Sequence, residues 1–300
     1  MNVIECNQLT KTYGRFNALI NLSFTIKENT ITGIIGRNGA GKTTLLKILA
    51  GFFRETKGEV KVFEEKPFNS LLVSANSIYI DEYMNYPTSL TLVDILHQNS
   101  RFYEKWNAQL ANRLFDYFSL QPKQHYNRLS KGQKNTFNAI VGLSSRCALT
   151  IFDEPTTGMD ASVRKDFYRA LLKDYLEHPR TILISSHHLD EIDDLIEEVL
   201  LIKNGEKHLH KPVEELKEYA IGVQGPEAAI TQWTAEQQVI HCRSLSPGTS
   251  YAVVENHFSA ALKAEATRMG LHFSPVTASD VCVYLTHQNK GGIDDVFNKY

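Results

Sequence analysis

The sequence predicts an α/β protein with a parallel core sheet, an antiparallel β subdomain near the N-terminus and a smaller α+β domain at the C-terminus. Three short apolar runs, at residues 31–35, 148–152 and 181–185, predict the core. Continuous apolar runs of this length are typical of strands that are buried on both faces of a parallel sheet. Helical patterns follow the first two runs, as parallel connections require.

Composition and charge narrow the class of protein. The chain has 300 residues, 42% of them apolar and 22% charged, with a formal net charge of −2. This balance is typical of a globular protein with a sizeable core and gives no reason to expect a nucleic-acid partner. No apolar run approaches the roughly 20 residues that a membrane helix needs, and no leader pattern follows the first residues. We therefore expect a cytoplasmic protein with reduced cysteines, whose membrane crossing, if any, belongs to another chain.

A phosphate-binding loop follows the first buried run. Residues 36–43 match the pattern Gly-x4-Gly-Lys-Thr, between a predicted strand and a predicted helix that ends near Gly51. Glycines let successive N–H groups approach an anion, and the helix N-terminus adds its dipole. Lys42 is expected to reach the β- and γ-phosphates and Thr43 to ligate Mg²⁺. The predicted nucleotide contacts here are Asn38, Gly39, Ala40, Gly41, Lys42, Thr43 and Thr44.

The segments around this loop have simple patterns. Alternation over residues 3–30 predicts short, mostly antiparallel strands, and residues 58–62 and 77–80 read as further strands. Residues 88–120 have a helical pattern that Thr91 is placed to cap. Ser130 is a second predicted N-cap, at the start of an apolar helix that includes Phe137.

Two polar clusters follow buried strands and complete the predicted active site. Asp153 and Glu154 end the run at 148–152, in the pattern called Walker B. Asp153 is expected to hold Mg²⁺ through water, and Glu154 to activate the attacking water as general base. The run at 181–185 leads into His187 and His188, and a histidine there can donate a hydrogen bond to a γ-phosphate. The residues alone leave the choice between the two histidines open.

Taken together and in this order, the motifs of residues 1–210 resemble the ATP-binding subunit of an ABC transporter. The resemblance is looser to bacterial drug- and peptide-exporter subunits of the bacitracin-export and acetoin-locus types. It implies a P-loop NTPase fold with a helical subdomain at about residues 83–147. It assigns nucleotide contacts to an adenine-stacking aromatic, the signature segment 129–133 and the loop at 157–160, and it selects His187 as the switch histidine. The residues so assigned are Tyr13, Ser130, Gly132, Gln133, Asp160 and His187.

Two positions depart from the family pattern. Lys131 stands where the signature usually has glycine, but Ser130 and backbone N–H groups are still expected to serve the phosphate. Glu82 stands where the Q-loop usually has glutamine. A carboxylate can ligate Mg²⁺, so Glu82 is a predicted metal ligand, but it loses an N–H donor and adds negative charge beside ATP.

The resemblance also implies partners. In the family two subunits enclose two ATP molecules head to tail, so we expect a homodimer or heterodimer with another ATP-binding subunit, loaded with ATP and Mg²⁺. The subunit would lie peripherally on the inner face of the cell membrane and drive a transmembrane permease subunit, with export favoured. An alternative is a soluble ABC-type regulatory or translation-associated ATPase. A P-loop kinase or GTPase lacks support, because no Asn-Lys-x-Asp motif is present.

Beyond the family signal, residues 211–218 read as a linker with a short helix, and residues 219–300 as an accessory domain. The predicted order is strand-helix-strand, twice, which is the ferredoxin-like arrangement. His241, Cys242, His257 and His272 in this domain have no metal-ligand spacing. We expect helices on one face of its sheet only, with the other face left for dimer contact or regulation.

Overall fold

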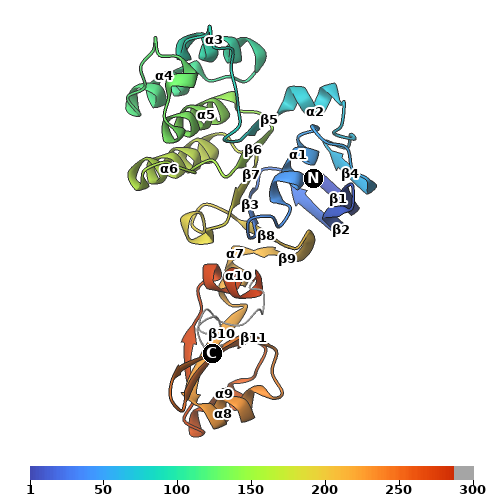
Figure 1. Ribbon diagram of the computed structural model, residues 1–300, viewed down its shortest axis with the longest axis vertical. Helices are drawn as coiled ribbons and strands as arrows, with labels where there is room; N and C mark the ends of the chain where they lie inside the picture. The colour runs from blue at the N-terminus through green and yellow to red at the C-terminus, as the bar shows by residue number, and fades with distance from the viewer. Residues whose placement is uncertain (287–300) are drawn as a thin grey trace, which may run out of the picture. The chain divides into compact units, whose positions relative to one another are not determined.

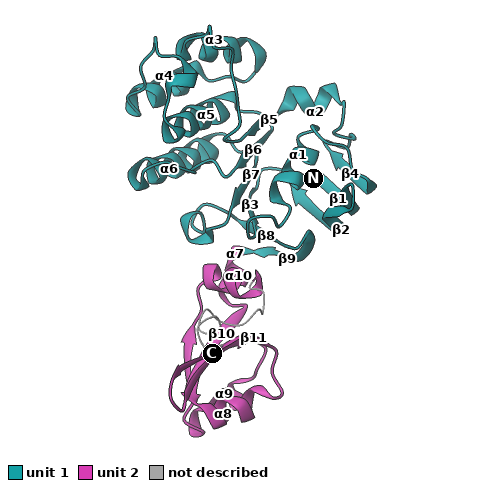
Figure 2. Ribbon diagram, viewed as in Figure 1, with its two compact units in different colours: residues 1–212 teal, residues 213–300 magenta. Residues whose placement is uncertain are grey.

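The computed structural model describes residues 1–286, which form two compact units (Figures 1 and 2). The first unit spans residues 1–212 and the second begins at Val213. The predicted linker lies across this division, with its first two residues in a strand of the first unit and Val213–Lys217 in a helix of the second. The predicted accessory domain extends to residue 300, so its last residues lie outside the described part of the chain.

The first unit contains two sheets and the helices that pack on them. Its strands are β1 (Asn2–Tyr13), β2 (Phe16–Lys27), β3 (Ile31–Ile35), β4 (Lys57–Val62), β5 (Ser77–Ile80), β6 (Leu149–Asp153), β7 (Thr181–Ser186), β8 (Glu198–Lys203) and β9 (Glu206–Pro212). Its α-helices are α1 (Lys42–Leu49), α2 (Leu71–Asn76), α3 (Leu92–Phe102), α4 (Ala108–Tyr117), α5 (Lys131–Ser145) and α6 (Ala161–Glu177).

The six-stranded sheet has the order β5-β6-β7-β3-β8-β9, parallel throughout except for the β8–β9 hairpin. Continuous apolar runs form β3, β6 and β7, each buried along its whole length, as the sequence predicts. Helix α1 lies between this sheet and the antiparallel sheet β2-β1-β4, and its Leu45 and Leu49 join the apolar core that both sheets share. The chain is thus an α/β protein with both parallel and antiparallel sheets.

The N-terminal strands are longer than predicted. The segment expected to form short strands is two strands of 12 residues each, paired antiparallel. The pairing register of the two strands shifts where the alternation of apolar and polar residues is broken. Gln8 and Asn21 have positive φ values of 51° and 52° there. β-Bulges therefore keep one ladder continuous where the pattern indicates interruptions.

Helices α3, α4 and α5 form a group on one side of the unit (Figure 1). Both predicted caps are present as capping boxes, with Thr91 paired to Asp94 and Ser130 paired to Gln133. Helix α5 packs on β5 and β6, and Phe137 on its inner face is fully buried beside Tyr86 and Tyr126. This contact fixes the N-terminus of α5 relative to the sheet.

The second unit has the strand order β11-β12-β10-β13, entirely antiparallel. Its elements are α7 (Val213–Lys217), β10 (Ala220–Pro226), α8 (Glu227–Thr234), β11 (Val239–Ser246), β12 (Thr249–Glu255), α9 (Ala260–Arg268), β13 (His272–Pro275) and α10 (Ala278–Thr286). Between β10 and β13 the order of strands and helices is the ferredoxin-like one. Helices α8 and α9 cover one face, where Trp233 and Ala266 join the core.

The second face of this sheet is not left open as expected. Tyr284 of α10 stacks on His241 of β11 with ring centroids 4.3 Å apart, and Val253 on this face is fully buried. The last described helix therefore folds back over part of the face. The expectation was wrong because α10 has an apolar surface to bury, and the uncovered face is the nearest one within its own unit.

Candidate active site

The predicted functional residues meet at one edge of the parallel sheet. Strands β3, β5, β6 and β7 run in the same direction, so their carboxyl ends lie along that edge. Gly36 follows β3, Asp81 follows β5, Asp153 ends β6 and His187 follows β7. In an open α/β sheet this edge is where ligands bind.

The loop between β3 and α1 approaches other backbone closely, which explains its glycines. A Cβ on Gly36 would lie 2.5 Å from the carbonyl oxygen of Ile202, and one on Gly41 would lie 2.6 Å from that of Ala18. Gly41 also has φ of 107°, a left-handed conformation that glycine adopts readily. The loop therefore delivers its N–H groups and the start of α1 to the pocket.

Lys42, the first residue of α1, is almost fully buried, at 5% exposed. Its Nζ donates a hydrogen bond to the carbonyl oxygen of Gly36 at 2.7 Å and lies 3.2 Å from Oε1 of Glu154. A buried ammonium held by one carbonyl and one carboxylate is oriented toward the centre of the loop. It is placed to contact a bound phosphate.

Asp153 is held by two hydroxyl groups. The Tyr79 hydroxyl donates to Oδ2 at 2.8 Å, and Ser185 Oγ donates to Oδ1 at 2.5 Å. Burial raises the pKa of Tyr79 far above its usual range, and the neighbouring Asp153 raises this pKa further. Tyr79 therefore stays a neutral donor, and Asp153 keeps a fixed orientation with lone pairs left to accept further hydrogen bonds.

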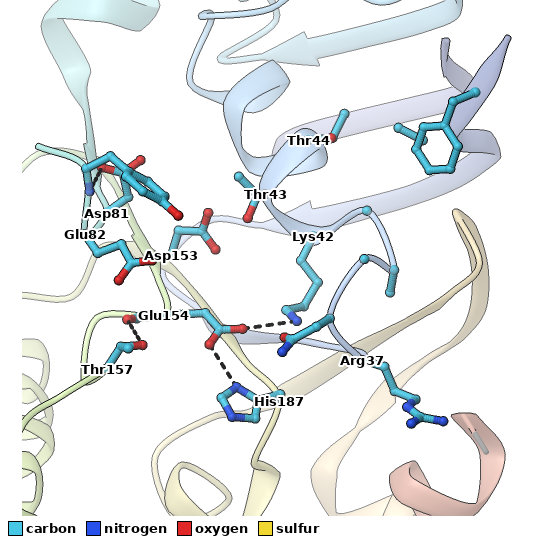
Figure 3. Close-up of a pocket in the computed structure, with 17 residues that line it drawn as sticks. Arg37, Lys42, Thr43, Thr44, Asp81, Glu82, Asp153, Glu154, Thr157 and His187 are labelled. Atoms are coloured by element: carbon cyan, nitrogen blue, oxygen red, sulfur yellow. Dashed lines mark hydrogen bonds and ion pairs between the residues drawn. The ribbon is translucent and has the colours of Figure 1, made fainter. Parts of the chain in front are cut away.

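Glu154 bridges two of the other site residues (Figure 3). Its Oε1 faces Lys42, and its Oε2 lies 2.8 Å from Nδ1 of His187. The residue has φ of 50°, which is uncommon for a side chain with a Cβ and costs on the order of 1 kcal/mol. The surrounding structure holds it there, because its N–H donates to Ser185 Oγ and its carbonyl accepts from Thr157. The turn after β6 thus aims a carboxylate into the pocket.

These residues line a pocket of about 600 Å³. Most of the predicted site residues belong to its lining: Asn38, Gly39, Ala40, Gly41, Lys42, Thr43, Thr44, Glu82, Asp153, Glu154 and His187. His188 is not in this lining, so the structure places His187 at the site. A cavity of this size accommodates a nucleotide-sized ligand.

Four predicted residues lie outside the lining and at helix starts. Ser130, Gly132 and Gln133 are at the beginning of α5, where Ser130 and Gln133 cap each other, and Asp160 is the N-cap of α6. Among residues 1–286, the lining of the pocket that contains Lys42 includes none of these four residues.

The aromatic residues in the pocket lining are Phe16 and Tyr83, and Tyr13 lies outside it. The Tyr13 ring packs edge-on against Phe53, with centroids 6.2 Å apart, and Lys11 Nζ lies 5.1 Å from its centroid. Phe16 begins β2 after the turn and is 63% exposed. Nothing in the sequence singles out Phe16, and Tyr13 as the adenine-stacking residue stays a prediction.

Glu82 makes an ion pair with Lys131 at the start of α5. The hydrogen bond from Lys131 is the main cause that lowers the pKa of Glu82, and the same contact raises the pKa of Lys131. Asp81, beside it, is 3.6 Å from Lys47 Nζ. The predicted metal ligand is therefore engaged by a lysine from a separate element.

The fold and the pocket define a nucleotide-binding protein of the P-loop class. A family model described as ABC transporter matches residues 19–157. The ABC transporter ATP-binding protein YtrB of Bacillus subtilis is 30% identical over 229 residues, which cover 74% of this chain and 76% of that protein. The bacitracin transport ATP-binding protein BcrA of Bacillus licheniformis is 31% identical, over 72% of this chain and 71% of that one. The chain therefore belongs to the ABC transporter family as an ATP-binding protein, and it is an ATPase.

Solved structures share the fold. The ATP-binding subunit of an ABC transporter has a TM-score of 0.64 and 21% identity, over 72% of this chain and 92% of that one. The dimeric bacterial ABC transporter cassette MJ0796 has a TM-score of 0.62 and 22% identity, over 70% and 98%. Over residues 1–286, no helix is long and apolar enough to cross a membrane.

Proposed function

We propose that this chain hydrolyses ATP with Glu154 as general base and His187 as its partner at the γ-phosphate, and that it thereby powers a separate membrane-spanning subunit. The observation that carries the proposal is the arrangement of Glu154 between Lys42 and His187, at 3.2 Å and 2.8 Å, in one pocket. The lysine is placed for phosphate, and the carboxylate for the water that attacks it.

The residues present fit Mg²⁺ when the nucleotide contributes ligands. No cluster of three or more His, Cys, Asp or Glu suited to a metal occurs among residues 1–286. Mg²⁺ typically uses one or two protein ligands together with phosphate oxygens and water. Thr43 and Asp153 both line the pocket and supply such oxygens. Bound there, Mg²⁺ would neutralise charge on the phosphates.

A complete site calls for a second subunit. Ser130 belongs to the signature segment but does not line the pocket of its own chain. We therefore propose a dimer in which Ser130 of each subunit serves the nucleotide of the other, in a homodimer or with an unlike mate. The dimeric cassette among the solved structures supports the arrangement. Light scattering on the Glu154→Gln protein should show dimers with Mg-ATP and monomers without it. A monomer with ATP shown to be bound would exclude the homodimer.

The partner we propose is a transmembrane permease, which would place this chain peripherally on the inner face of the membrane. The bacitracin transport protein named above supports a transport role, and export follows the resemblance to such subunits. For the second unit we propose dimer contact or regulation. Truncation after Pro212 leaves the first unit's own core intact, so ATP binding should persist while dimerisation or ATPase regulation changes. Loss of ATP binding in a folded truncated protein would contradict this role.

A further inference from the structure

Two residues that depart from the family pattern at distant points of the sequence are in contact, and one of them, Glu82, lines the pocket. Glu82 lies in the loop after β5, and Lys131 is the first residue of α5. Their side chains form an ion pair between Lys131 Nζ and Glu82 Oε2. Each replaces a neutral residue of the family pattern. In the structure these two charged residues contact each other.

The pair is ionised and partly exposed. Glu82 is 29% exposed and Lys131 57%. The ammonium of Lys131 and the carboxylate of Glu82 are in direct contact, so each is the counter-charge of the other. The neighbouring acid Asp81 has its own cation in Lys47. Lys131 is thus the cation that the described structure assigns to Glu82.

The charge on the pocket lining makes this cation important. Four carboxylates line the pocket, from Asp81, Glu82, Asp153 and Glu154, against two cations from Arg37 and Lys42. A triphosphate brings several more negative charges into the same space. A carboxylate at Glu82 without a counter-charge would oppose its entry, and like charges at short range disfavour each other.

We propose that Lys131 is a positioning residue for nucleotide binding, which holds and neutralises the Glu82 carboxylate so that the pocket accepts a triphosphate. The proposal rests on the nucleotide site described above. It also links the loop after β5 to the start of α5, because one ion pair joins them. Replacement of either partner alone leaves the other without its partner, and replacement of both restores a neutral pair.

Equilibrium binding of a non-hydrolysable ATP analogue to the full-length protein tests the proposal. Lys131→Ala should raise the Kd by up to about fivefold, which corresponds to the upper end of the range for an exposed ion pair. Lys131→Arg should bind like wild type, and Glu82→Gln should bind at least as tightly. The double variant Glu82→Gln/Lys131→Ala should return to the Kd of Glu82→Gln. The matched control is Lys134→Ala on the same helix, whose Nζ lies 5.6 Å from the ring of Tyr126, and it should leave the Kd unchanged.

Thermal unfolding of each variant establishes that it is folded. An unchanged Kd in Lys131→Ala, or a raised Kd that Glu82→Gln does not restore, overturns the proposal. Lys42→Ala distinguishes a wrong assignment of the nucleotide site from a wrong assignment of the role of Lys131. If Lys42→Ala fails to weaken the analogue, the nucleotide site itself is misassigned and the proposal falls with it. If Lys42→Ala weakens binding and Lys131→Ala does not, only the role of Lys131 is refuted.

Discussion

Gly132→Ala is expected to perturb both stability and catalysis through one contact. A Cβ at this position would lie 2.3 Å from the carbonyl oxygen of Gly158 and 3.2 Å from its carbonyl carbon. Both are backbone atoms, so the clash is not relieved by turning a side chain. Either the start of α5 or the loop at residues 156–159 must shift.

The expected change in the free energy of unfolding follows from two opposing effects. Alanine favours the helix over glycine by about 1 kcal/mol. Overpacking against fixed backbone typically costs about 1–3 kcal/mol. Because the contact is far below van der Waals distance, we expect a net loss of about 1–2 kcal/mol, or roughly 2–8 °C in the Tm of a unit of this size.

The rate of ATP hydrolysis should fall by a larger factor than the equilibrium constant for folding. Thr157 lies in the loop at residues 156–159, and its hydroxyl donates to the carbonyl oxygen of Glu154 at 3.0 Å. A displacement of the loop therefore moves the turn that aims the Glu154 carboxylate. Small displacements of a catalytic group cost on the order of 10²-fold in rate. The assays are thermal unfolding and phosphate release at saturating Mg-ATP. A variant with wild-type Tm and wild-type turnover would refute the reasoning.

Two further predictions concern the stability of the first unit. Asp174→Ala should lower the free energy of unfolding in urea by about 3–5 kcal/mol. The reason is that Arg146 and Arg180, at 2.7 Å and 2.8 Å from Asp174, would be left without that carboxylate. A loss below about 1 kcal/mol would contradict this prediction. Burial lowers the pKa of His210, although Glu198 at 3.1 Å opposes the shift. The unfolded chain then binds the proton first as pH falls below about 6.5, so stability is lost in that direction. His210→Gln should lose less stability between pH 7 and pH 5, and an identical pH profile would exclude this role.

Local chemistry explains which features the sequence predicts well. The strands β3, β6 and β7 are continuous apolar runs. The loop after β3 has the Gly-x4-Gly-Lys-Thr spacing, which few other kinds of loop share. The caps at Thr91 and Ser130 are local as well, since a capping box needs only residues three apart. The placement of Lys42, Glu154 and His187 in one pocket follows from the parallel sheet, because strand ends share an edge.

Features that depend on tertiary contact were not predictable. The pair between Glu82 and Lys131 joins segments almost 50 residues apart, and no local pattern reports it. The position of Phe16 in the pocket lining, with Tyr13 outside it, depends on the geometry of one hairpin. The position of α10 over the second face of the sheet in the second unit depends on where that helix finds apolar surface. Each outcome is decided by packing between elements rather than by propensity within one.

The central claim is that Glu154 activates water for ATP hydrolysis in this pocket. Steady-state phosphate release by Glu154→Gln, at a Mg-ATP concentration shown to saturate binding, tests it most directly. Loss of a general base commonly costs about 10²-fold or more, so turnover should fall at least that far. ATP affinity should stay within a few-fold of wild type, because Lys42 and the loop after β3 remain. Turnover within a few-fold of wild type at full occupancy would contradict the claim and exclude Glu154 as the base.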